Sequence, residues 1–130
     1  MSKYTDTAPG IYAIYVDDVI RYVGQSGNVK NRWRQHKGSL KRGEHENEAL
    51  QAAFSKRGAN SFRFVSLYLL PNVVASAIDA ATLRALLLSL EQSFIDTIAD
   101  MQPNHKLFNE YHNAFLSLPF HLRCGWYYRV

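Results

Sequence analysis

Three side chains in this sequence have the types and spacing to act on an anionic group. Arg32 and His36 lie four positions apart, so both would project from one face of a helix. The guanidinium is a charged fork that can grip an oxyanion, and a neutral imidazole near pH 7 can take a proton or contact an anion. The alternative is a surface arginine with a histidine near a helix end. Glu91 is the third.

Glu91 falls between Leu87 and Phe94 or Ile95, at or beside the apolar stripe of a long helical pattern. A carboxylate in such a position is costly unless it is paired or holds a metal. One carboxylate supplies too few oxygen ligands for calcium but suits magnesium or manganese, which keep several bound waters. The alternative is a glutamate at the helix edge, paired with Arg84 or a lysine.

Two tyrosines lie in runs rich in β-branched and aromatic residues, 11–16 and 19–24, on either side of Asp17-Asp18. Such runs predict a β-hairpin whose first strand is buried on both faces. If Tyr12 and Tyr22 serve one site, the hairpin needs a three-residue loop, pairing Tyr12 with Tyr22, or a bulge. A free tyrosine has a pKa of about 10, so a nearby cation would have to help it act as a base. Tyr15 is expected in the core.

The remaining elements follow from turn signals and apolar spacing. Ser26 or Asn28 is a candidate cap for the next helix, and Thr82 for the long helix that carries Glu91. The expected elements after the hairpin are helix 29–37 ending near Gly38, loop 39–46, helix 47–57 stopped by Gly58, strand 61–70, and the long helix ending before Pro103. This outline predicts a small α+β domain with a mostly antiparallel three-stranded sheet flanked by helices.

Composition sets the broad class. The chain has 130 residues, 47% of them hydrophobic, and a net charge of +4 with a pI of about 9.3. Its single cysteine, Cys124, excludes an internal disulfide and a Cys-rich zinc site. Apolar runs are well short of the ~18 residues that span a bilayer, and the first residues carry no signal segment. We therefore expect a soluble, cytoplasmic protein without a membrane partner.

Several short motifs follow one another along the chain in the order that is typical of a known family. Gly10-Ile11-Tyr12 and Tyr22-Val23-Gly24, followed by Arg32, His36 and the segment Leu90 to Ile95, resemble the GIY-YIG endonuclease family, with Val23 in place of the usual isoleucine. Lys56 to Phe62 resembles the family loop before the third strand. The resemblance covers residues 8–109. We expect residues 1–109 to form the catalytic domain and 110–130 a short extension packed on it.

The resemblance implies metal-dependent hydrolysis of DNA phosphodiester bonds, leaving a 5′-phosphate and a 3′-hydroxyl. The implied catalytic residues are Tyr12, Tyr22, Arg32 and His36, with Glu91 as ligand of one divalent cation, Mg²⁺ or Mn²⁺. The family also places an asparagine after the long helix. Asn104 has the better spacing for it, and Asn109, after Leu107-Phe108, has the better context.

Basic residues in and after helix 29–37 are expected to contact the phosphate backbone of DNA. They are Lys30, Arg34, Lys37, Lys41 and Arg42. The alternative is a solvated helix face. Trp33 could stack on a base, although a tryptophan in a helix is more often core.

Three functional hypotheses remain. The first is an endonuclease of phage, homing, restriction or repair type. The second is a catalytically silent nucleic-acid-binding module of the same fold. The third is a partner-binding domain that uses the aromatic tail at Trp126 to Tyr128. Target recognition would come from the module and its loop 38–46, from a separate partner, or from the second subunit of a homodimer.

Overall fold

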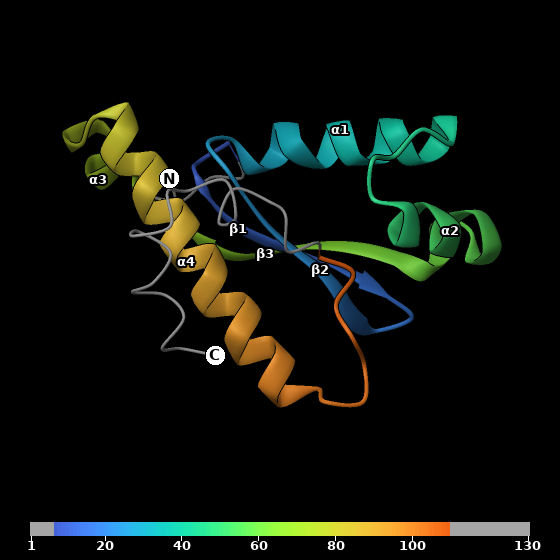
Figure 1. Ribbon diagram of the computed structural model, residues 1–130. Helices are drawn as coiled ribbons and strands as arrows, with labels where there is room; N and C mark the ends of the chain where they lie inside the picture. Colours follow the sequence, from blue (N-terminus) through green and yellow to red (C-terminus); the bar gives the residue numbers. More distant parts are fainter. Residues whose placement is uncertain (1–6, 110–130) are drawn as a thin grey trace.

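The computed structural model describes residues 7–109, so the predicted C-terminal extension lies outside the described residues. Three strands form an antiparallel sheet in the order β2-β1-β3. The strands are β1 (Gly10–Val16), β2 (Val19–Ser26) and β3 (Phe62–Leu69). The helices are α1 (Val29–Arg42), α2 (Glu48–Arg57), α3 (Asn72–Ala77) and α4 (Ala80–Met101), with a 3₁₀ turn, η1 (Ala59–Ser61) (Figure 1). The predicted α+β architecture is confirmed.

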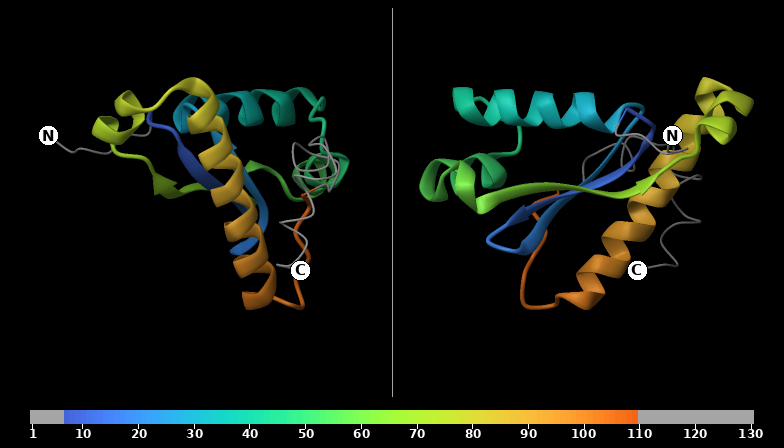
Figure 2. Two further views of the ribbon diagram at one scale, coloured as in Figure 1. Left: turned by 60° about the vertical axis from the view of Figure 1, so that its left-hand side comes forward. Right: turned by 180° about the vertical axis from the view of Figure 1, so that it is seen from behind.

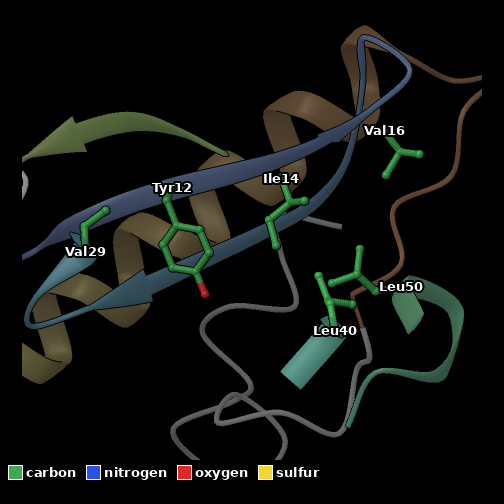
Figure 3. Close-up of a cluster of buried hydrophobic side chains, with 6 residues drawn as sticks. All are labelled: Tyr12, Ile14, Val16, Val29, Leu40 and Leu50. Atoms are coloured by element: carbon green, nitrogen blue, oxygen red, sulfur yellow. The ribbon is translucent and has the colours of Figure 1, made fainter. Parts of the chain in front are cut away.

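Helices cover both faces of the sheet (Figure 2). Side chains alternate along a strand, so β1 sends successive residues to opposite layers. One layer joins β1 to α1 and α2, and its buried members are Tyr12, Ile14, Val16, Val29, Leu40 and Leu50 (Figure 3). On the opposite face, Ile11 and Val23 pack with Leu87 and Ile98 of α4. The expected burial of β1 on both faces is confirmed, apart from half-buried Tyr15.

A bulge places the two tyrosines on one face. Asp17 and Asp18 form a two-residue turn with φ of 50° and 66°, the left-handed values of the favoured hairpin turns. The register then shifts between Ile14 and Tyr15, so that Tyr22 lies opposite Ile14 while Tyr12 lies opposite Gly24. The predicted bulge is confirmed. The alternative of a three-residue loop with Tyr12 directly opposite Tyr22 is wrong, because the tyrosines are diagonal neighbours.

Two predicted helix boundaries are wrong. Helix α1 continues through Gly38 to Arg42, since Leu40 is buried in the core and Gly43, with φ of 73°, supplies the C-terminal cap. The predicted loop 39–46 is correspondingly shorter. Helix α4 begins after Asp79, whose carboxylate accepts from the Thr82 N–H at 2.7 Å, so Asp79 rather than Thr82 is the cap.

Two aromatic residues are less buried than expected. Tyr15 is half-buried near the hairpin turn, with the Arg63 guanidinium 4.5 Å from its ring centre. Trp33 is also half-buried and packs beside Phe64 of β3. Within residues 7–109, none of the helices combines the length and apolar character needed to cross a bilayer.

Candidate active site

Tyr12 lies almost completely inside the protein, where its ring covers Gly24 of the neighbouring strand. Its exposed fraction is 1%. A Cβ at Gly24 would fall 2.3 Å from the Tyr12 hydroxyl oxygen, far closer than atoms can approach. Glycine at position 24 therefore creates the space in which the Tyr12 ring lies.

His36 of α1 completes an aromatic cluster with both tyrosines. The ring centres of Tyr12 and Tyr22 are 6.4 Å apart, with 27° between the planes. The His36 ring meets each tyrosine edge-on at 5.4 Å. The helix places His36 there because Val29 and Leu40, on the same side of α1, are anchored in the core. The sequence-predicted Tyr12, Tyr22 and His36 are thus neighbours in space.

A chain of hydrogen bonds runs from Tyr12 through two histidines. The Tyr12 hydroxyl oxygen is 2.6 Å from Nε2 of His36. Nδ1 of His36 is 2.7 Å from Nε2 of His45, and the two rings are stacked. Nδ1 of His45 accepts from the backbone N–H of Asn47 at 3.0 Å. Asn47 is in turn the N-cap of α2, so the start of that helix fixes the far end of the chain.

The donor and the acceptor of each bond in this chain can be assigned by starting from the backbone N–H of Asn47. A backbone N–H can only donate, so Nδ1 of His45 must be unprotonated. In neutral His45 the proton is then on Nε2 and is donated to Nδ1 of His36. Neutral His36 likewise carries its proton on Nε2 and donates it to the Tyr12 oxygen. The Tyr12 hydroxyl therefore accepts from His36, and its own proton points elsewhere.

Burial keeps both histidines neutral. It lowers the pKa of His36 from 6.5 to about 3, helped by the charge of Arg32 and by His45. The pKa of His45 is also lowered, chiefly by burial. Both ring nitrogens of His36 are occupied by these hydrogen bonds, so in this structure neither is free to accept a proton or to contact a phosphate. Its direct contact is with the Tyr12 oxygen.

Arg32 is the cation of this cluster. Its guanidinium bonds to Gln35 at 3.0 Å and approaches the exposed Glu46 carboxylate at 3.6 Å. Burial raises the pKa of Tyr12 and Tyr22 above the ordinary value, and Arg32 acts against this by charge and hydrogen bonding. Both tyrosines are therefore neutral at rest, with a positive group beside them that favours loss of a proton.

Glu91 of α4 approaches this site near Gln25 at the end of β2. Burial raises its pKa from 4.5 to about 7, while the backbone N–H of Gln25 lowers it. The charge of Glu91 also raises the pKa of both tyrosines, which puts its carboxylate within electrostatic reach of them. Across the described residues no lysine or arginine forms an ion pair with Glu91, so the alternative of a pairing with Arg84 or a lysine is not seen there.

A half-buried carboxylate that forms no ion pair with a described residue fits a divalent cation. Residues 7–109 contain no group of three or more His, Cys, Asp or Glu side chains that could hold a metal ion. Glu91 would accordingly hold a metal with at most one further side chain of these kinds from residues 7–109. That donor set suits Mg²⁺ or Mn²⁺, which retain waters and borrow phosphate oxygens, better than calcium.

The two candidate asparagines lie in different places. Asn109 contacts the free edge of β2, where its amide oxygen accepts from the N–H of Val23 at 2.9 Å and its amide nitrogen donates to the carbonyl of Val23 at 2.6 Å. It thereby fixes the strand next to Tyr22. Asn104 is exposed in the turn after α4. Asn109 is the one that adjoins the tyrosine cluster.

The five basic residues expected to contact DNA are all exposed on α1. None of them takes part in the Tyr12–His36 cluster, and Arg42 pairs with Glu44 at 3.2 Å. His45 and Asn47 were not predicted as site residues, because the sequence places them in a polar loop and at a helix start. The only available signal was a histidine two positions before a helix cap, and such a pattern is common.

Comparison with known proteins agrees with this geometry. The family model described as the GIY-YIG catalytic domain matches residues 8–103. The chain belongs to the GIY-YIG family, and it is an endonuclease of that type.

Among solved structures, the chain is similar to the catalytic domain of homing endonuclease I-TevI. The TM-score is 0.57 with 24% identity, covering 75% of this chain and 96% of that chain. This likeness supports the fold. No curated protein sequence matches the chain.

Proposed function

We propose that the protein is a metal-dependent DNA endonuclease that hydrolyses phosphodiester bonds to a 5′-phosphate and a 3′-hydroxyl. One observation carries the proposal in a chain of this family. The buried Tyr12 hydroxyl accepts from His36 at 2.6 Å beside the Arg32 cation, an arrangement that stabilises a phenolate.

Tyr12 is the base in this proposal. At rest its pKa is raised, chiefly by burial, so it holds its proton until positive charge reaches the site. Once that proton has passed to solvent, the donors from His36 and Arg32 stabilise the phenolate. The phenolate oxygen then takes a proton from water as the water oxygen bonds to phosphorus. The bond from phosphorus to the 3′-oxygen breaks, and that oxygen takes up a proton from solvent.

Arg32 and Tyr22 orient the phosphate. The guanidinium presents a fixed charged fork to the phosphate oxygens, where charge grows in the transition state. Tyr22 is neutral because burial raises its pKa, so its hydroxyl can donate a hydrogen bond to the same group. Glu91 would hold Mg²⁺ or Mn²⁺, and the charge of such a cation would offset negative charge on the phosphate and on the departing oxygen.

Cleavage of supercoiled plasmid tests the proposal. Wild type is compared with Arg32→Ala and Glu91→Gln, with Mg²⁺, with Mn²⁺ and with chelator. Arg84→Ala and Glu48→Gln are matched controls, because both residues are exposed and lie outside the cluster. Circular dichroism checks that each variant folds.

We expect nicked or linear product from wild type and from both controls, and its loss in both site variants and with chelator. Folded wild type that binds DNA without cutting it, with either metal, would overturn the proposal in favour of a silent binding module. The dependence of linear product on protein concentration then tests whether a homodimer or a separate recognition partner is required for cutting both strands.

A further inference from the structure

A hollow lies between α1, α2 and β3. Its volume is about 440 Å³. That size falls within the range of about 300 to 1,000 Å³ of small-ligand sites. Four of its lining residues are aromatic, namely Trp33, Phe54, Phe62 and Phe64. Figure 2 shows β3 passing beneath α1 from the end of α2.

The aromatic walls are arranged as pairs. Trp33 and Phe64 have ring centres 6.4 Å apart, and Phe54 meets Phe62 edge-on at 5.2 Å. The indole nitrogen of Trp33 is itself buried and has no acceptor in the described part of the chain. What the hollow offers an occupant is therefore flat apolar surface.

Its charged lining residues are all cations. Lys37 and Lys41 line the hollow and are exposed, and no acidic side chain lines it. Arg63 also lines it, but its guanidinium lies over the Tyr15 ring and pairs with Asp18 at 3.8 Å. The Lys37 ammonium lies 5.6 Å from the centre of the Phe64 ring. An occupant that complements this site has a flat ring and carries negative charge next to it.

The cations continue along the helix. Lys30, Arg34, Lys37 and Lys41 recur at i, i+4, i+7 and i+11, so they form one stripe along α1. In the sheet order β2-β1-β3, Tyr12 and Tyr22 lie on β1 and β2, whereas Phe64, next to Lys37, lies on β3. His36 faces β1 and β2, whereas Trp33 and Lys37 face β3. Helix α1 thus has the catalytic cluster on one flank and the basic stripe on the other.

We infer that this hollow binds an unpaired nucleotide of the DNA substrate, its base between the aromatic rings and its flanking phosphates on the basic stripe. The bases of an intact duplex are stacked on their neighbours and cannot enter such a hollow. The bases of a single strand or a branch point can stack on aromatic side chains while cations track the backbone. The inference rests on the proposed nuclease function and narrows its substrate to DNA with single-stranded segments.

Tryptophan fluorescence tests this inference without any cleavage. The chain has two tryptophans, Trp33 and Trp126, so Trp126→Phe leaves Trp33 as the only indole. This protein is titrated in chelator with oligothymidylate of about 12 nucleotides, a length within known single-strand site sizes. The same titration is done with duplex of that length and with an oligonucleotide carrying abasic central positions. Anisotropy of labelled DNA records binding independently.

We expect oligothymidylate to quench Trp33, and the duplex and the abasic strand to bind with little quenching. Lys37→Ala with Lys41→Ala should weaken oligothymidylate binding about tenfold or more, since two phosphate contacts are lost. The double variant Lys56→Ala with Lys106→Ala removes the same charge from exposed positions outside the hollow and should bind like the parent.

Binding of oligothymidylate without quenching, or equal quenching by the duplex, would overturn the inference. Equal loss of binding in both double variants would do the same, since it would show only a general charge effect. If the protein cleaves DNA but Trp33 is not quenched, nucleotide binding in the hollow is rejected and the proposed nuclease function is not. If Trp33 is quenched but the protein cleaves no DNA, the proposed nuclease function is rejected and nucleotide binding in the hollow is not.

Discussion

The backbone N–H of Asn47 donates to Nδ1 of His45 at 3.0 Å, and this bond sets the protonation of every group up to Tyr12. Because His45 must donate through Nε2, His36 must do so too, and Tyr12 must accept. A residue that caps α2 therefore determines how the buried tyrosine in β1 presents its oxygen.

His45 can be tested as a positioning residue. His45→Phe keeps a flat ring but removes the donor to His36, so His36 is free to accept from Tyr12 instead. We expect the turnover rate to fall by about 10- to 100-fold with little change in DNA affinity. His45→Gln keeps an amide donor and should retain more activity. Nitrogen-15 NMR should show a proton on Nε2 of His36 in wild type. A proton on Nδ1 there would contradict the relay.

The low pKa of His36 predicts acid destabilisation. Below about pH 6.5 the unfolded chain gains a proton on this residue, whereas the folded chain does so only near pH 3. Its contribution is thus present above pH 6.5 and is lost as pH falls toward 3, by at most about 1.4 kcal/mol per unit. In urea unfolding, the free energy of unfolding of His36→Gln should depend less steeply on pH than that of wild type. The control His105→Gln changes an exposed histidine and should keep the wild-type pH dependence. Equal slopes for all three proteins would refute the assignment.

The close approach of the Tyr12 ring to Gly24 predicts that no larger side chain is tolerated at position 24. A Cβ at this position would lie 2.3 Å from the Tyr12 hydroxyl oxygen, so Gly24→Ala must displace the ring. We expect loss of about 1 to 3 kcal/mol in the free energy of unfolding and a large loss of cleavage. Gly27→Ala is the matched control, since nothing lies within 4 Å of a Cβ there. Similar behaviour of the two variants would mean that the ring has room to move.

Glu91 predicts opposite effects of pH and of metal on stability. Its pKa is raised by burial to about 7, so wild type without metal loses stability as pH rises from 4.5 through 7. In chelator near pH 8, Glu91→Gln should be more stable than wild type by about 1 to 3 kcal/mol. Mn²⁺ should stabilise wild type and Glu48→Gln in thermal melts but leave Glu91→Gln unchanged. Stabilisation of Glu91→Gln by Mn²⁺ would mean that the metal binds elsewhere.

Local sequence patterns could predict much of this molecule. The hairpin, the helix stops at Gly58 and Pro103, and the chemical types at Tyr12, Tyr22 and Arg32 are all visible over short spans. The need for either a three-residue loop or a bulge was also predictable, because period-two alternation would otherwise separate the tyrosines. The position of the bulge could not be predicted from the sequence. It depends on the left-handed turn at Asp17-Asp18 together with the pairing of β1 to β3.

Features formed by tertiary contacts could not be predicted. His45 comes from a polar segment and gains its partner only when α1 and α2 fold over β1. The end of α1 depends on burial of Leu40, which outweighs the low helix propensity of Gly38. The basic residues near Arg32 are close to it in sequence, yet helical geometry turns four of them to the opposite flank.

The central claim is that the Tyr12 oxygen acts directly on the water that attacks phosphorus. Tyr12→Phe removes only that oxygen and keeps the ring over Gly24, so the fold should be preserved. Tyr15→Phe, on the opposite face of the same strand, is the matched control. With Mg²⁺ and supercoiled plasmid, we expect Tyr12→Phe to cut at least about 100-fold more slowly than wild type. Tyr15→Phe should cut at the wild-type rate. Cleavage by folded Tyr12→Phe at the wild-type rate would contradict the account.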